Sequence, residues 1–147
     1  MKKCLLVCLF LCGLMPQLFA QTAFNFDTAS DIDIKDLIYY ISWLQAEKTS
    51  NVSTVVARAM EIYPAASGPL SRLPDESSDD LNGDGVADIK DLIFMISWIQ
   101  AEKISDFTIV ENRALEIWNG VGSLSKLPGT PIGGSTVPVT ITGIQLD

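Results

Sequence analysis

Residues 80–91, DLNGDGVADIKD, carry oxygen-bearing side chains at a spacing that suits a metal ion. Asp80, Asn82 and Asp84 occupy alternate positions, and Gly85 after them permits a sharp turn. A like-charge pair about 4 Å apart costs roughly 1 kcal/mol in water, so crowded carboxylates favour a bound cation. The alternative is a Gly- and Asp-rich turn that holds no metal. The spacing predicts a calcium loop whose ligands are Asp80, Asn82, Asp84, the Val86 carbonyl, Asp88 and Asp91.

A second, weaker copy of this loop precedes residue 36. When Asp36 is aligned with Asp91, Ala29 replaces the third side-chain ligand and Ser30 replaces the turn glycine. The remaining candidate ligands of this copy are Asn25, Asp27, Asp31, Asp33 and Asp36. We therefore expect one good calcium site and one degenerate site.

The segments expected to position these loops occur as two similar copies along the chain. IKDLIYYISWLQAEK at 34–48 and IKDLIFMISWIQAEK at 89–103 are nearly identical at an offset of 55. ARAMEIY at 57–63 matches NRALEIW at 112–118, and LSRLP at 70–74 matches LSKLP at 124–128. This self-similarity predicts two repeats, at about 24–74 and 79–128.

Each repeat is expected to contain two helices after its loop. Apolar residues recur at helical spacing in both copies, and Asp33 and Asp88 stand where an N-cap is favoured. Ser53 and the capping-box pattern from Thr108 to Glu111 are expected to begin the second helices. We predict an all-α fold in which residues 21–128 pack as one small helical domain around a four-helix core.

Both ends of the chain differ from this domain. Residues 1–20 combine Lys2 and Lys3 with a short apolar run ending at Ala20, which is typical of a secretory signal peptide. A membrane anchor, a buried helix and a lipoprotein signal are the alternatives. Residues 129–147 predict a linker followed by an irregular or strand-like tail, which is either a loose terminus or a segment for a partner.

Composition narrows the chemistry further. The three cysteines all lie within residues 1–20 and histidine is absent, which removes cysteine nucleophiles, histidine bases and nearly all zinc chemistry. Without Lys2 and Lys3, 8 lysines and arginines face 18 acids, a net charge of −10. This balance favours cations over nucleic acid or anionic lipid.

Large side chains beside the main apolar stripe of each first helix permit two interpretations. Tyr40, Trp43, Met95 and Trp98 occur at matched positions in the two copies. They form either a partner-binding face or the core between the repeats.

The segment DLNGDGVADIKDLIFMISWI resembles the calcium-binding loop-helix of type I dockerin domains, a variant of the EF-hand loop that ends in Asp. The resemblance implies a duplicated loop-helix fold, with Asp80, Asn82, Asp84, Asp88 and Asp91 as side-chain ligands and Val86 as a carbonyl ligand. It also implies a cohesin-like protein partner, through which secreted bacterial proteins join polysaccharide-degrading assemblies.

Three classes of function follow from these observations. The first is a calcium-binding, dockerin-like module exported to the extracellular space, the cell surface or the periplasm, which acts by protein–protein interaction and leaves the membrane after signal cleavage. The second is a calcium-stabilised structural or buffering surface protein without a cohesin-type partner. The third, an enzyme with paired carboxylates, is disfavoured because eight of the 18 acids are assigned to the loops and the chain is short for a sugar cleft, so we expect no catalytic residues.

Overall fold

The computed structural model describes residues 21–29 and 31–132. The expected signal segment, Ser30 and most of the tail lie outside these residues. Within them the chain forms a small, mostly helical domain without strands, in agreement with the all-α prediction. The helices are α2 (Ile34–Gln45), α3 (Val52–Ile62), α4 (Ile89–Gln100) and α5 (Phe107–Ile117).

The N-termini of α2 and α4 follow the prediction closely. Asp33 and Asp88 are the N-caps, and their side chains accept hydrogen bonds from the backbone N–H groups of Lys35 and Lys90. Asp36 and Asp91 complete a capping box in each helix. A carboxylate also interacts favourably with the positive end of the helix dipole, so the sequence determines these two helix starts locally.

The caps expected for α3 and α5 are wrong. Asn51, not Ser53, caps α3 and accepts a hydrogen bond from the Thr54 N–H. Asp106 caps α5 and accepts from the Thr108 N–H at 2.9 Å, so the observed cap lies two residues before the cap predicted at Thr108. The capping box fails because Glu111 accepts instead from the Leu124 N–H at 2.6 Å, in the chain beyond α5.

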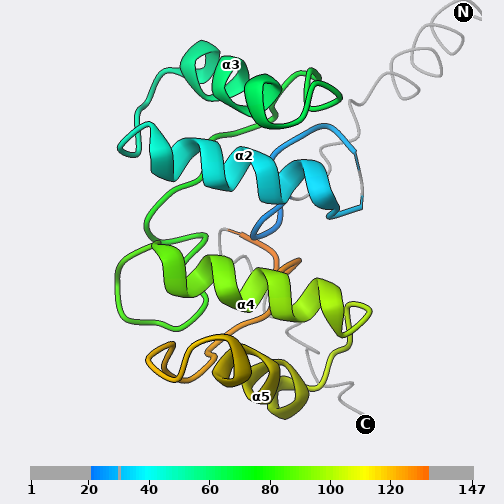
Figure 1. The fold of residues 1–147 in the computed structure, drawn as a ribbon, viewed down its shortest axis with the longest axis vertical. Coiled ribbons are helices and arrows are strands. Elements are labelled where there is room, and N and C mark those ends of the chain that lie inside the picture. The colour runs from blue at the N-terminus through cyan, green and yellow to red at the C-terminus, as the bar shows by residue number, and fades with distance from the viewer. Residues whose placement is uncertain (1–20, 30, 133–147) are drawn as a thin grey trace, which may run out of the picture.

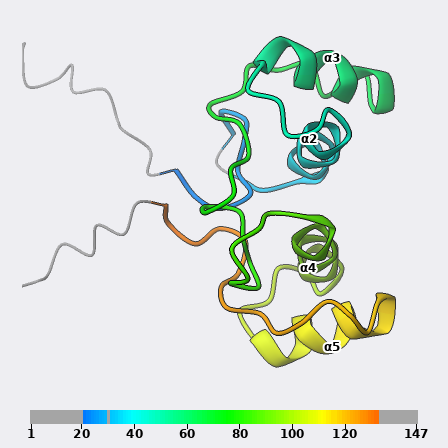
Figure 2. The same cartoon turned by 90° about the vertical axis from the view of Figure 1, so that its left-hand side faces the viewer.

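The four helices form a row rather than the expected four-helix core. Their spatial order is α3, α2, α4, α5, with α2 and α4 in contact at the centre (Figure 1). The outer helices bury only narrow stripes of small side chains, Val55 and Ala59 in α3 and Val110 and Ala114 in α5. The connecting segments and both ends of the described chain lie on one side of this row (Figure 2).

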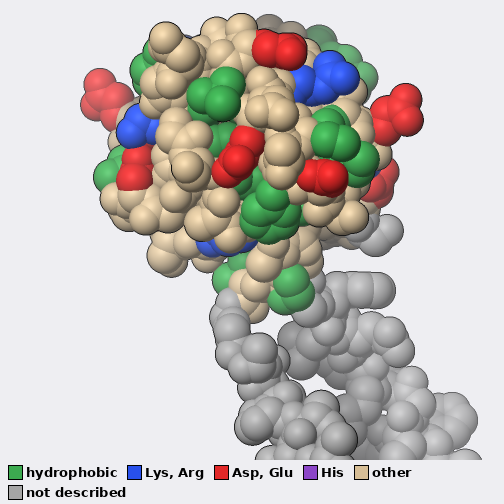
Figure 3. All heavy atoms as spheres, turned by 90° about the horizontal axis from the view of Figure 1, so that it is seen from below, with side chains coloured by type: hydrophobic (Ala, Val, Ile, Leu, Met, Phe, Trp, Pro, Cys, Tyr) green, Lys and Arg blue, Asp and Glu red, His purple; other side chains and the backbone are tan. Residues whose placement is uncertain are grey.

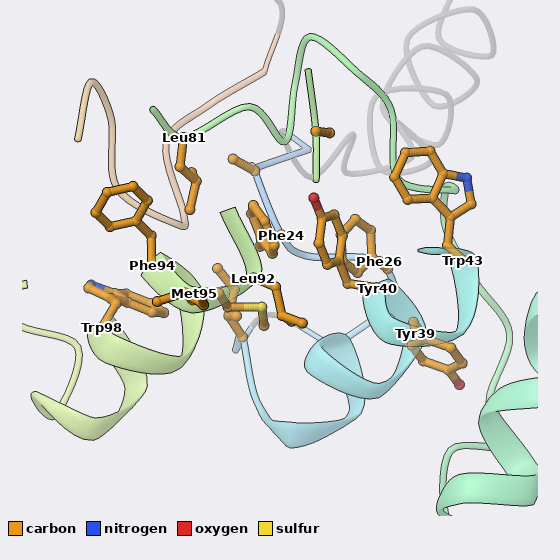
Figure 4. Packing of buried hydrophobic residues seen from close by; sticks show 14 of the residues in the cluster. Phe24, Phe26, Tyr39, Tyr40, Trp43, Leu81, Leu92, Phe94, Met95 and Trp98 are labelled. Atoms are coloured by element: carbon orange, nitrogen blue, oxygen red, sulfur yellow. The ribbon is translucent and has the colours of Figure 1, made fainter. Parts of the chain in front are cut away.

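Much of the core lies between the helices and the segments that precede them. Phe24, Phe26 and Tyr40 are fully buried and pack ring against ring, with Phe24 and Tyr40 centroids 4.6 Å apart (Figure 4). Leu81 and Met95, also fully buried, occupy the corresponding places near α4. At positions 26 and 40 the first half therefore contributes aromatic rings, whereas the matched positions 81 and 95 of the second half contribute aliphatic side chains.

The two ends of the described chain are joined to each other. The Ala23 N–H donates to the Thr130 carbonyl at 2.8 Å, and the Gly129 N–H returns a bond to the Ala23 carbonyl at 2.8 Å. The Ile132 N–H donates to the Gln21 carbonyl at 2.8 Å. Residues 129–132, which we expected to begin the linker, thus pair with the start of the helical domain.

Hydrophobic side chains reach the surface on the outer helices. Five residues of α5 and its C-cap are two-fifths or more exposed, and the view onto this end shows hydrophobic side chains among acidic ones (Figure 3). They are Phe107, Ile109, Leu115, Ile117 and Trp118. Among the described residues, none of the helices has the length and apolar character needed to cross a bilayer.

Candidate metal site

Two glycines and the first aspartate shape the loop at residues 80–91. Gly83 and Gly85 adopt φ values of 76° and 90°, in the left-handed region that side chains other than glycine rarely enter. The Asp80 carboxylate accepts hydrogen bonds from the N–H groups of both glycines, each at 2.7 Å. The first expected ligand therefore lies inside the turn, held by two backbone donors.

Asn82 and Asp84 repeat this pattern on the exposed side of the loop. The Asn82 Oδ1 atom accepts from the Asp84 N–H at 2.9 Å, and the Asp84 Oδ1 atom accepts from the Val86 N–H at 3.0 Å. The Asp84 Oδ2 atom lies 2.8 Å from the Lys90 ammonium, which lowers the pKa of the Asp84 carboxyl below its usual range. Asp84 is thus ionised at neutral pH.

Asp91 holds the loop to the first turn of α4. One carboxylate oxygen accepts from the Leu81 N–H at 2.7 Å and from the Asn82 N–H at 3.3 Å, and the other accepts from the Asp88 N–H at 2.8 Å. Its side chain is fully buried, and this burial raises its pKa to about 6 against the opposing effect of the hydrogen bonds. The last expected ligand is therefore also the residue that closes the loop.

The candidate ligands are close in the chain, but their carboxylates are not grouped around one point. Within residues 21–29 and 31–132, no three carboxylate, histidine or cysteine side chains are grouped closely enough to hold a metal ion. The carboxylates of Asp80, Asp84 and Asp91 are each directed to N–H groups. Their donor chemistry fits a hard cation such as Ca²⁺, because carboxylate, amide and carbonyl oxygens are its preferred ligands. The carboxylates would have to come closer together to bind it.

The first loop has an aspartate, Asp36, that closes it as Asp91 closes the second loop, but it lacks part of the ligand set. Asp36 accepts from the Phe26 N–H at 2.8 Å and the Asp33 N–H at 2.9 Å, and its burial raises its pKa to about 6. The Asp27 carboxylate accepts from the Ala29 N–H at 2.8 Å. The loop is therefore tied to α2 as its counterpart is to α4, although Ala29 offers no side-chain oxygen.

Two more candidates of the first loop have separate environments. The Asn25 amide donates to the Ala29 carbonyl at 3.0 Å, while its buried Oδ1 atom has no hydrogen-bond partner among the described residues. Asp31 is three-quarters exposed and pairs with the Lys103 ammonium at 2.7 Å. Lys103 follows α4, so the second half of the chain supplies the positive charge to this acid.

The four large side chains considered for partner binding are buried. Tyr40 and Met95 have no exposed surface, Trp43 is 3% exposed and Trp98 is 8% exposed. The Tyr40 hydroxyl also donates to the Asp88 carbonyl at 3.0 Å, which links α2 to the cap of α4. The arrangement fits the core alternative, since a partner would reach these groups only if the domain opened.

Three residues outside the predicted site position the second loop. Asp79, fully buried, receives two hydrogen bonds from the Arg72 guanidinium, at 2.8 and 2.6 Å, and one from the Phe24 N–H at 2.9 Å. The Glu76 carboxylate accepts from the Ala87 N–H at 2.7 Å. The repeat pattern gave no signal for Asp79, because the matched position in the first half is Phe24.

Comparison with protein-family models, with curated proteins and with solved structures finds no match for this chain.

Proposed function

We propose that this protein is an exported, calcium-binding, dockerin-like module in which the loop at residues 80–91 holds the ion. The observation that carries the proposal is the set of six oxygen ligand positions from Asp80 to Asp91, which spans the turn glycines and ends in the first turn of α4. Asp80, Asn82, Asp84 and Asp88 would bind through side chains, Val86 through its carbonyl, and Asp91 from the first turn of the helix. The ion would supply two positive charges to a loop that contains four carboxylates.

Matched hydrogen bonds support a tandem repeat as the framework of this site. The Phe26 carbonyl accepts from the Ser71 N–H at 2.7 Å, and the Leu81 carbonyl accepts from the Ser125 N–H at 2.7 Å. Asp36 and Asp91 receive equivalent N–H groups from Phe26 and Leu81. Under the proposal, each repeat consists of a loop, a capped helix and a second helix, as in a duplicated EF-hand-like unit.

Calcium would act chiefly on stability. Extracellular calcium modules bind with dissociation constants of about 10⁻⁴ to 10⁻³ M. At ten times the dissociation constant, binding stabilises the folded state by about 1.4 kcal/mol. This is a useful fraction of the margin of a small domain, so a structural ion is favoured over a signalling one.

Isothermal titration with a matched pair of variants tests the calcium function. Asp84→Asn removes one carboxylate of the second loop, and Asp31→Asn removes an exposed carboxylate of the first loop. We expect D84N to weaken calcium binding by roughly tenfold or more and D31N to change it little. Equal effects of the two variants, or two equally tight sites in the unmodified protein, would contradict the assignment.

The proposed partner is a cohesin-like protein domain, an expectation that rests on the resemblance of residues 80–99 to dockerins. Binding to purified cohesin modules, with calcium and with chelator, tests it directly. We expect retention on an immobilised module only when calcium is present. Calcium binding without retention by any module would favour the second candidate, a calcium-stabilised structural or buffering surface protein.

A further inference from the structure

One positive side chain reaches into the candidate calcium loop. The Lys90 Nζ atom lies 2.8 Å from the Asp84 Oδ2 atom, and the Asn82 amide donates to the same oxygen at 3.1 Å. Lys90 is on the first turn of α4, so its position is determined by the helix that follows the loop. The pair is partly covered, with side-chain exposures of 30% for Lys90 and 35% for Asp84.

The first half of the chain provides a natural comparison. Lys35 occupies the position 55 residues before Lys90, but Ala29 stands where the second loop has Asp84. In the described part of the chain Lys35 forms no ion pair. Among the described residues, an ion pair between the first-turn lysine and the loop before its own helix therefore occurs only in the half that has the fuller set of candidate calcium ligands.

A lysine in this place would have two opposite effects. Its charge offsets part of the repulsion among the four carboxylates at Asp80, Asp84, Asp88 and Asp91, which favours the fold when calcium is scarce. It also engages an oxygen that calcium would use, and it repels an approaching divalent cation. An ammonium group and a bound ion on the same carboxylate would lie roughly 5 Å apart, given calcium–oxygen distances of about 2.3–2.6 Å.

We propose that Lys90 is a built-in competitor of calcium, which holds Asp84 in the absence of the ion and limits the affinity of the loop. This inference rests on the proposed calcium function. Repulsion between charges of +1 and +2 at roughly 5 Å in water corresponds to about a fifteenfold change in binding. Screening by physiological salt reduces that effect to roughly five- to tenfold.

The test compares Lys90→Met with Lys35→Met in the full protein. Both variants remove one positive charge from the same helical position of a repeat, and methionine keeps an unbranched side chain suited to a helix. Calcium titration at physiological salt should show roughly five- to tenfold tighter binding for K90M and less than about a twofold change for K35M. In the presence of chelator, K90M should unfold at a lower temperature than the unmodified protein, whereas K35M should not.

A double variant keeps the test specific to the contact. If Lys90 acts through Asp84, the gain in affinity from K90M should become much smaller when Asp84 is already Asn. Equal behaviour of K90M and K35M, or weaker calcium binding by K90M, would overturn the proposal while leaving the calcium site intact. Absence of calcium binding in the unmodified protein and in all variants would overturn the calcium function itself, and this proposal with it.

Discussion

Replacing Asp91 with Asn separates its structural role, which is to close the loop, from its proposed role as a calcium ligand. Asp36 is the matched control, because it makes the same structural contact in a loop that lacks a complete set of candidate ligands. Each carboxylate closes its loop through both oxygens, and each side chain is fully buried. An asparagine can preserve the bonds to one oxygen. Its NH₂ group would then face the Asp88 N–H in D91N, or the Asp33 N–H in D36N. Both groups are hydrogen-bond donors, so the backbone N–H would lose its acceptor.

The expected cost follows from that single mismatch. A buried N–H left without an acceptor costs about 1–3 kcal/mol. Part of this cost is offset, because the substitution also removes a buried negative charge. Burial of that charge is unfavourable, as the raised pKa of about 6 of each carboxyl group indicates. We expect D36N and D91N each to destabilise the chelated protein by about 1–2 kcal/mol, which lowers the Tm by roughly 4–10 °C for a domain of this size.

Thermal unfolding followed by circular dichroism, in chelator and in millimolar calcium, measures both effects. In chelator the two variants should behave alike. Calcium should raise the Tm of the unmodified protein and of D36N, and should raise that of D91N little or not at all. A D91N protein as stable as the unmodified one in chelator would refute the structural role, and a calcium response equal to that of D36N would refute the ligand role.

Three further expectations concern pH, the link between the halves and the loop backbone. Burial raises the pKa of Asp36 and Asp91 to about 6, so both carboxyl groups bind protons more tightly in the folded state than in the unfolded state. Their protonation therefore stabilises the fold at low pH, and this stabilisation is lost as the pH rises through 6. The Tm in chelator should therefore increase between pH 7.5 and 5, while calcium affinity measured by titration should decrease as Asp91 is protonated; the opposite trends would contradict these assignments. Tyr40→Phe removes the bond to the Asp88 carbonyl and should destabilise the fold by about 1 kcal/mol in urea unfolding, whereas an unchanged midpoint would show that this bond contributes little. Gly85→Ala places a side chain at a φ of 90° and should cost about 1 kcal/mol or more, with Gly68→Ala, where φ is not positive and space is open, as the control that should change little.

Local signals in the sequence were sufficient for the starts of α2 and α4. Asp33 and Asp88 each precede an apolar helical pattern, and a capping interaction involves only residues within one turn. The caps of α3 and α5 were missed because several polar residues near each start are suitable. The Glu111 side chain accepts a hydrogen bond from the Leu124 N–H, 13 positions away, and a local capping pattern cannot indicate such a distant partner.

The arrangement of the helices required information that periodicity does not contain. A helical pattern identifies an apolar stripe but not the element that covers it. Small residues at Val55, Ala59, Val110 and Ala114 let the outer helices pack against α2 and α4 through narrow contacts, which produces a row. Connecting segments then cover one side of this row, where a bundle would place further helices (Figure 2).

The turn at residues 80–91 and its oxygen-bearing side chains could be predicted from the sequence, whereas the ion pairs around the loop could not. Alternating oxygen side chains and glycines indicated the turn at residues 80–91, and Gly83 and Gly85 adopt the left-handed backbone that it needs. The contact of Lys90 with Asp84 depends on the direction in which α4 leaves the loop. The buried pair of Arg72 with Asp79 has no counterpart in the other half of the sequence, where Phe24 matches Asp79, so the similarity of the two halves could not indicate it.

Direct calcium titration of the purified protein tests most simply whether the loop at residues 80–91 holds the ion. We predict one site with a dissociation constant of about 10⁻⁴ to 10⁻³ M, which is weakened strongly by Asp84→Asn and little by Asp31→Asn. Absence of binding at millimolar calcium, or binding that persists unchanged in D84N, would contradict the assignment of the ion to residues 80–91.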